Sequence, residues 1–241
     1  ADIETAARDR PDARRVFLAD GDALVLPVDD LKAILDRLGD ALPNLGRVSC
    51  YATPLTLRQK KPDELSSLKG YGLSLLYVGL ESGSDDILKR ITKGATQETM
   101  VRSLDRARAG GMKVSATVIL GLGGRNRWHD HIEGTAELVN RAPPRFLSTL
   151  QLYLERSVAG RFMERFGEPF EPQDDVAILA EQEHLIAALD PPSPVIFRSN
   201  HASNCLALAG NLPKDKGRLL AEIDSARTGA TPLRPAALRG L

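Results

Sequence analysis

Short apolar runs alternate with amphipathic helical patterns along almost the whole chain. The runs predicted as strands cover residues 14–19, 46–52, 74–80, 113–122, 145–154 and 194–199. The segments predicted as helices cover residues 28–42, 62–72, 84–91, 96–111, 128–141, 157–166, 174–189 and 214–226. Because the strands are almost continuously apolar and are separated by helices, the pattern predicts an α/β fold with a parallel sheet covered on both faces, either a barrel or an open sheet.

Composition narrows the class of protein. The chain has 241 residues, of which 42% are hydrophobic and 27% are charged, and Lys plus Arg equals Asp plus Glu at 32 each. These values are typical of a globular protein and give no global field that would attract nucleic acid or an anionic membrane. No apolar run is long enough to cross a bilayer, and the N-terminal residues lack the apolar core of a secretory signal, so we expect a cytoplasmic protein with no membrane partner and no clear nucleic-acid surface.

Two cysteines, Cys50 and Cys205, lie far apart in the sequence and form neither a C-x-x-C pair nor any metal-binding spacing. We expect both to be reduced, buried thiols.

Polar residues follow several predicted strands, where parallel α/β folds bind their ligands. The stretch ADGDAL places Asp20, Gly21 and Asp22 at one strand end, where the carboxylates could bind an ammonium group or form a simple Asx turn. In GLESGS, Glu81 could accept both hydroxyls of a ribose; alternatively Ser84 is an ordinary N-cap and Glu81 is solvated.

Two further strand ends carry candidate chemistry. The turn ILGLGG, residues 119–124, lacks the lysine of a P-loop and the glycine spacing of a Rossmann turn, so it is either an apolar shelf for an adenine or a plain strand end. The last strand ends in RSNHASN, whose Arg198, Asn200 and His201 could bind a polar substrate. Alternatively, Ser203 caps a helix and His201 only makes local hydrogen bonds.

The stretch RWHDHIEG, residues 127–134, contains His129, Asp130, His131 and Glu133. On a helix, positions two apart face different directions, so His129 and His131 would not converge on one ion. We therefore expect no metal site in this chain.

Three stretches together, ADGDAL, GLESGSDDILKRITKG and VILGLGG, occur in an order and spacing that resembles the radical S-adenosylmethionine (SAM) superfamily. The similarity is greatest to the branch containing methylthiotransferases, the catalytic subunit of Elongator and oxygen-independent coproporphyrinogen oxidase. This resemblance implies a partial (β/α)6 TIM-like barrel. It also implies a division into a barrel of residues 1–155 holding strands two to six of the family, an α-rich extension of residues 156–227, and a flexible tail of residues 228–241.

Proteins of this superfamily cleave SAM reductively at a [4Fe-4S] cluster and so generate a 5'-deoxyadenosyl radical. By resemblance, the methionine amino group of SAM would contact Asp20, Gly21 and Asp22. The ribose would contact Glu81, with Ser82 beside it, and the carboxylate of SAM would contact Lys93. The adenine would lie on Ile119, Leu120, Gly121 and Leu122. Substrate residues are expected among Gln151, Tyr153, Arg198, Asn200 and His201, and an external electron donor such as flavodoxin or ferredoxin is implied.

The sequence departs from the family pattern in two ways. The C-x3-C-x2-C motif that binds the cluster is absent, and Tyr51 stands where some relatives have a carboxylate. The first readable strand matches the second strand of the family, so we expect the chain to be a fragment whose first strand and cluster loop lie upstream of Ala1. As given, it should be inactive, and the cluster would belong to the full-length protein only.

Two other hypotheses stay open at this stage. The chain is a degenerate, non-catalytic barrel that binds a nucleotide or serves as a scaffold, or it is an unrelated barrel lyase or isomerase. The second of these would use Lys93 or Glu81 in acid–base or Schiff-base chemistry.

Overall fold

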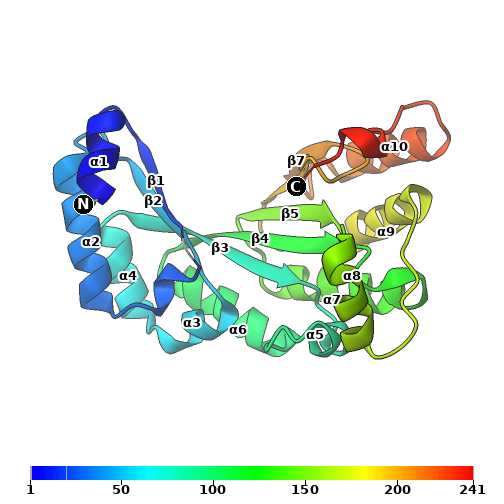
Figure 1. The fold of residues 1–241 in the computed structure, drawn as a ribbon, viewed down its shortest axis with the longest axis horizontal. Helices are drawn as coiled ribbons and strands as arrows, with labels where there is room; N and C mark the ends of the chain where they lie inside the picture. The colour runs from blue at the N-terminus through cyan, green and yellow to red at the C-terminus, as the bar shows by residue number, and fades with distance from the viewer. Residues whose placement is uncertain (1, 20, 241) are drawn as a thin grey trace. The chain divides into compact units, whose positions relative to one another are not determined.

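The computed structural model describes residues 2–19 and 21–240, which form an α/β fold (Figure 1). Its seven strands follow the order β1-β2-β3-β4-β5-β6-β7, so neighbours in the sequence are neighbours in the sheet. Strand β2 (Arg47–Tyr51) pairs in parallel with β1 (Arg15–Leu18) and with β3 (Leu73–Glu81). Strand β6 (Val195–Ser199) pairs in parallel with β5 (Phe146–Gln151) and antiparallel with β7 (Leu208–Leu212). The predicted α/β class with a mainly parallel sheet is confirmed, and β7 is a strand that the sequence pattern did not predict.

Contacts within the chain divide it into two compact units. Unit 1 comprises Ala1–Gly79 and Arg102–Ser115, and unit 2 comprises Leu80–Val101 and Ala116–Leu241. Strands β3 and β4 (Lys113–Leu120) and helix α6 (Gln97–Ala109) each contribute residues to both units. This division rests on contacts alone. The ends of the barrel at residue 155 and of the extension at residue 227 were expected from the family resemblance, and they stay predictions.

Unit 1 packs its helices through leucines spaced at helical intervals. Helix α2 (Val28–Ala41), which falls within the helix predicted for residues 28–42, buries Leu31, Leu35 and Leu38 on one face. The other helices of this unit, besides part of α6, are α1 (Asp2–Asp9), the short 3-10 helix η1 (Ala23–Val25), α3 (Pro54–Gln59) and α4 (Pro62–Gly70). Helix α3 escaped the sequence analysis because it is only six residues long. It begins at a capping box between Thr53 and Thr56, with a proline at the first helical position.

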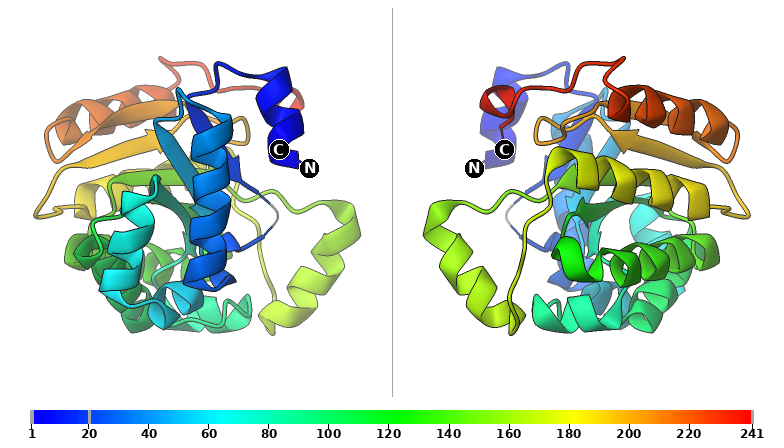
Figure 2. Two further views of the ribbon diagram at one scale, coloured as in Figure 1. Left: turned by 90° about the vertical axis from the view of Figure 1, so that its left-hand side faces the viewer. Right: turned by 90° about the vertical axis from the view of Figure 1, so that its right-hand side faces the viewer.

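The longer helices of unit 2 pack against one another in sequence. Helix α7 (Gly124–Arg141) packs against α9 (Asp175–Ala188), which packs against α10 (Lys216–Arg227), and α10 also packs against β7. The right-hand view of Figure 2 shows α10, α9 and α7 stacked in that order. A separate apolar cluster of Ile87, Leu122, Phe166 and Phe170 joins α5 (Asp85–Arg90) and α8 (Arg156–Phe166) to the turn after β4. A short 3-10 helix, η2 (Ala236–Leu238), lies near the C-terminus.

Cys50 and Cys205 are both buried and unpaired, as predicted. Burial raises the pKa of Cys50 to about 12 and that of Cys205 to about 11, so both stay thiols at neutral pH. Among the described residues, no helix has the length and apolar character needed to pass through a bilayer.

The loop after β3 touches helix α7 through two glycines. A Cβ built on Gly83 would lie 2.1 Å from the carbonyl oxygen of Gly134, and one built on Gly134 would lie 2.7 Å from the carbonyl oxygen of Gly83. The N–H of Gly83 donates to Thr135 Oγ1 at 2.9 Å in the same place. Since the atoms in the way are backbone, no rotamer change could relieve the clash, and both glycines are needed for the loop to reach the helix.

We expect Gly83→Ala to lower the free energy of unfolding by about 1–3 kcal/mol, because the added methyl group overpacks this contact. The matched control is Gly160→Ala in α8, where a Cβ would meet nothing within 4 Å. That change should raise the free energy of unfolding by about 0.5–1 kcal/mol through helix propensity. Urea denaturation followed by circular dichroism measures both, and equal stability of the Gly83 variant and the parent would contradict the packing described.

Candidate functional site

Strand β3 ends on a residue with an unusual backbone. Glu81 has φ of 63°, and Thr92 has φ of 58°; among the described residues no other non-glycine residue has a positive φ. A side chain in this region costs of order 1–3 kcal/mol and persists only where the surrounding structure holds it. Such residues are concentrated at binding sites, so the carboxylate of Glu81 is a strong candidate for a ligand contact.

The second strained residue positions Lys93. Helix α5 ends in a Schellman motif, in which Thr92 N–H donates to Lys89 O at 3.1 Å and Lys93 N–H donates to Leu88 O at 2.9 Å. Thr92 occupies the left-handed position usually given to glycine. The motif turns the chain back so that Lys93 Nζ lies 3.1 Å from Glu81 Oε1. The two side chains are 20% and 22% exposed, so the pair is largely shielded from water but still open to a ligand.

A buried relay supports the loop behind this pair. His131 of α7 accepts a hydrogen bond from Ser82 Oγ at its Nδ1, over 2.8 Å, and donates from Nε2 to the carbonyl oxygen of Ile119, over 3.0 Å. Ser82 Oγ in turn accepts from the N–H of Ser84 at 3.0 Å. Since a carbonyl can only accept, the neutral tautomer with a proton on Nε2 satisfies every partner. The relay ties the turn after β3 to the end of β4.

Glu181 of α9 holds the adjacent turn. Its Oε1 accepts from the N–H of Gly121 at 2.8 Å and lies 3.6 Å from His131 Nε2, and the Glu181 side chain is fully buried. Burial raises the pKa of Glu181 to about 8, although the Gly121 N–H acts in the opposite direction. Burial lowers the pKa of His131 to about 4. At neutral pH most Glu181 is therefore protonated and His131 is neutral, so no isolated charge is buried there.

The apolar turn after β4 lies deeper than predicted. Leu120 and Leu122 are 1% and 3% exposed, and Leu122 packs in the cluster with Phe166 and Phe170. Ile119 is partly buried and packs against the same cluster. Gly121 has φ of 82°, and a Cβ there would lie 2.8 Å from the side chain of Ile178. The surface that this turn can offer a flat ligand is therefore the side chain of Ile119 and the backbone, and not the two leucines.

The remaining predicted SAM contacts belong to unit 1. Asp20 lies outside the described residues, and Gly21 has φ of 83°, as a tight turn requires. The carboxylate of Asp22 accepts from Leu24 N–H at 3.1 Å, Thr53 N–H at 2.9 Å and Thr56 Oγ1 at 2.7 Å. The bond from Leu24 is that of the Asx-turn interpretation, and the bonds from Thr53 and Thr56 fasten the turn to the start of α3.

Tyr51 lies in an exposed aromatic group of unit 1. Its ring meets Phe17 edge to face, with centroids 4.8 Å apart, and Phe17 meets Tyr77 in the same way at 5.3 Å. Tyr51 is 51% exposed and Phe17 38%. Strands β1, β2 and β3 therefore present an aromatic surface around Tyr51.

The predicted substrate residues separate into two groups, both in unit 2. Gln151 and Tyr153 line a cavity of about 350 Å³, together with Glu155, Ser203 and Arg239. Gln151 is also bonded on both sides, since its Nε2 donates to Asp175 at 3.1 Å and its Oε1 accepts from Cys205 N–H at 3.2 Å. Arg239 closes one wall through two hydrogen bonds to Asp175, at 2.6 and 2.7 Å, which lower the pKa of that carboxyl.

Arg198, Asn200 and His201 are not among the residues that line this cavity. The guanidinium of Arg198 lies 4.8 Å from the ring centre of Phe146, and Asn200 is exposed. His201 Nδ1 lies 3.2 Å from the N–H of Ser203 and 2.9 Å from its hydroxyl, so His201 is satisfied locally, as the alternative interpretation held. The helix cap expected at Ser203 is wrong, because the next element after β6 is strand β7.

Sequence reasoning missed Thr135 and Glu181, and it considered His131 only as a possible metal ligand. A signal for them exists, because each lies on the buried face of a helix, beside Ile132 in α7 or Ile178 in α9. Polar side chains are seldom fully buried without a hydrogen-bond partner, so these positions indicate polar contacts inside the unit. The identity of those partners depends on packing and could not be read from spacing.

Comparison with known proteins identifies a family and a fold. Residues 1–139 match the model of the family described as the radical SAM superfamily. The heme chaperone HemW of Bacillus subtilis (strain 168) is 28% identical over 137 residues, which are 56% of this chain and 36% of HemW. The chain thus spans little more than a third of that curated relative.

Two solved structures show a similar fold. Coproporphyrinogen III oxidase (HemN) from Escherichia coli, described as a radical SAM enzyme, aligns with a TM-score of 0.58 at 16% identity, covering 77% of this chain and 44% of that chain. The archaeal Methanocaldococcus infernus Elp3, with an N-terminal deletion, aligns with a TM-score of 0.63 at 13% identity, covering 95% of this chain and 59% of that chain. The likeness at these identities concerns the fold, and it confirms the predicted α/β fold of partial-barrel type.

The buried carboxyl group predicts a distinctive pH dependence. Glu181 keeps its proton up to about pH 8 when folded but loses it near its ordinary pKa of 4.5 when unfolded, so stability falls as the pH rises between these values. His131 has the opposite effect between about pH 4 and its ordinary pKa of 6.5, where stability rises with pH. From pH 6.5 to 8, of these two residues only Glu181 binds a proton in the folded protein and not in the unfolded one. It lowers the free energy of unfolding by up to about 1.4 kcal/mol per pH unit over this range.

Glu181→Gln keeps an acceptor for Gly121 and removes the titration, so we expect it to flatten the decline in unfolding free energy between pH 6.5 and 8. The matched control is Glu183→Gln, two positions along α9, where the native carboxylate pairs with Arg227 at the surface. This control should keep the parental slope. Urea denaturation at several pH values gives the comparison, and an unchanged slope in the Glu181 variant would refute the assignment.

Proposed function

Because the chain belongs to the radical SAM superfamily, we propose that it forms the part of a radical SAM enzyme that binds S-adenosylmethionine and the substrate. The observation that carries this proposal is the ion pair between Glu81 and Lys93, which stands on strained backbone within the segment that matches the family. A pair held in this way is prepared for a ligand that offers hydroxyl groups and a carboxylate.

Glu81 uses one oxygen for Lys93, at 3.1 Å, which leaves the other to accept from ribose hydroxyls. The ammonium of Lys93 keeps two further N–H groups, enough to bind the carboxylate of the methionine part of SAM. The Ser82–His131–Ile119 relay keeps the Glu81 loop in place, and the side chain of Ile119 offers the adenine an apolar edge.

SAM cleaved reductively at a [4Fe-4S] cluster would supply a 5'-deoxyadenosyl radical. The cysteines of this sequence do not fit such a cluster, because Cys50 and Cys205 are both buried and belong to different units. Three thiolate ligands would have to come from residues that this sequence does not contain. We therefore assign to this chain the work of binding, orienting and shielding the reactants.

The substrate is proposed to enter the cavity lined by Gln151 and Tyr153, whose volume of about 350 Å³ suits a small molecule or one part of a larger one. Glu155 and Arg239 give this cavity one acidic and one basic group, so a substrate with both polar and apolar parts is favoured. We propose a cytoplasmic enzyme that receives its electron from an external donor such as flavodoxin or ferredoxin.

A non-catalytic nucleotide-binding protein is the second candidate. The observation in its favour is the lack of a cysteine trio in the sequence. A lyase using Lys93 in Schiff-base chemistry is less well supported, because that reaction needs an unpaired amine and Lys93 is held by Glu81 at 3.1 Å.

Calorimetric titration of the chain with SAM tests the proposed binding site. We expect Glu81→Gln and Lys93→Met to weaken SAM binding about tenfold or more, since each removes a charge-assisted hydrogen bond. Glu137→Gln, a change at an exposed carboxylate of α7, is the matched control and should bind SAM as the parent does. Equal binding by all variants would exclude the site.

A second measurement separates the two candidate functions. The full-length polypeptide, reconstituted anaerobically with iron and sulfide and then reduced in the presence of SAM, should produce 5'-deoxyadenosine. SAM binding without any 5'-deoxyadenosine, from protein with no iron–sulfur absorption, would favour the non-catalytic candidate.

A further inference from the structure

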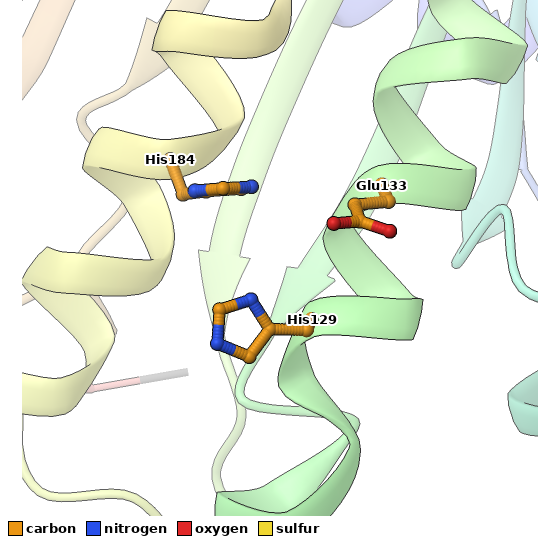
Figure 3. Close-up of side chains that lie close together, drawn as sticks. All are labelled: His129, Glu133 and His184. Atoms are coloured by element: carbon orange, nitrogen blue, oxygen red, sulfur yellow. The ribbon is translucent and has the colours of Figure 1, made fainter.

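Three potential metal ligands converge on the outer side of helices α7 and α9. His129 and Glu133 are one turn apart on α7, and His184 projects from α9 (Figure 3). One ligand atom from each residue lies within 4.8 Å of the other two. In the part of the chain that the structure describes, no other group of three His, Cys, Asp or Glu side chains meets this condition.

We propose that His129, Glu133 and His184 bind a divalent transition-metal ion of the zinc class. Two imidazole nitrogens and one carboxylate oxygen form a donor set that suits Zn²⁺, with the fourth position left for water or an added ligand. This site goes beyond the proposed SAM chemistry and shares no residue with it.

The geometry needs only a small adjustment to receive the ion. Two ligand atoms bound to one tetrahedral zinc lie about 3.5 Å apart, since each metal–ligand bond is about 2.0–2.2 Å. The present spread of 4.8 Å therefore has to shrink by about 1 Å. His129 and Glu133 are exposed and His184 is half-buried, so rotation about the side-chain bonds can close this distance without moving either helix.

The three side chains are not committed to other polar partners. Among the described residues, neither imidazole nor the Glu133 carboxylate has a hydrogen bond or an ion pair with another side chain. Neighbouring charges on the same helices are already engaged, since Arg127 pairs with Glu168 and Asp86, and Glu183 pairs with Arg227. A cation would therefore meet an open carboxylate and two open imidazoles.

An aromatic side chain orients both imidazoles. Trp128 stacks on His129, with ring centroids 3.5 Å apart, and meets His184 edge to face at 5.7 Å. These contacts restrict the rings before an ion arrives, which lowers the entropy lost on binding. Trp128 is also the only tryptophan of the chain, so its fluorescence reports directly on this place.

A metal here would clamp the two helices that support the SAM-binding loops. Helix α7 carries His129 on its outer side and the buried His131 on its inner side, and α9 likewise carries His184 and the buried Glu181. An ion that binds only the folded state stabilises it, so bound metal should raise the melting temperature and make local opening of α7 from α9 less frequent.

Quenching of Trp128 fluorescence by Ni²⁺, with Zn²⁺ as the competitor, tests the proposal on the full chain. We expect saturable 1:1 quenching at micromolar Ni²⁺, reversal by Zn²⁺ and by a chelator, and weakening as the pH falls, because protons compete for the imidazole nitrogens. His129→Ala and His184→Ala should each weaken binding at least tenfold, and Glu133→Gln should weaken it measurably.

His201→Ala, which removes a histidine elsewhere in unit 2, is the matched control and should bind Ni²⁺ as the parent does. Circular dichroism confirms that each variant is folded, and Zn²⁺ should raise the melting temperature of the parent and of the His201 variant more than that of the three ligand variants. The absence of saturable quenching, or equal quenching in the parent and the His184 variant, would overturn the proposal.

Discussion

The turns after β3 and β4 carry buried backbone groups, and each of these groups has to find a hydrogen-bond partner away from water. Helices α7 and α9 supply the partners. Thr135 accepts from Gly83, Glu181 accepts from Gly121, and His131 donates to the carbonyl of Ile119 while accepting from Ser82. Because an unpaired buried donor or acceptor costs about 1–3 kcal/mol, this set of bonds leaves the two turns little freedom to move relative to each other.

The rigidity of these turns explains how Glu81 can hold a strained backbone. On one side it is followed by Ser82, which is fully buried and bonded, and on the other it continues strand β3. The left-handed conformation at Glu81 and Thr92 directs a carboxylate and an ammonium at each other over 3.1 Å. Strain of this kind is sustained by surrounding packing, so the ion pair depends on the buried hydrogen bonds of the neighbouring turns.

The repeating strand–helix pattern could be predicted because hydrophobic periodicity is a local property. The leucine face of α2 and the near-continuous apolar run of β3 appear in the sequence and in the structure at almost the same residues. Strand β7 could not be predicted in this way. Its Gly210 and Asn211 disfavour a strand on propensity, and it exists because its backbone completes hydrogen bonds along the edge of β6.

For the site, the sequence by itself determined the family and the position of Glu81 and Lys93, since the GLESGSDDILKRITKG stretch carries both at a fixed spacing. It also determined that His129 and His131 face different ways on α7, as helical geometry requires. Only the tertiary structure decided that Leu120 and Leu122 are buried, that Glu181 holds Gly121, and that His184 joins His129 and Glu133. The physical reason is that periodicity along one element assigns a residue to a face, whereas the partner across that face is chosen by how separate helices pack.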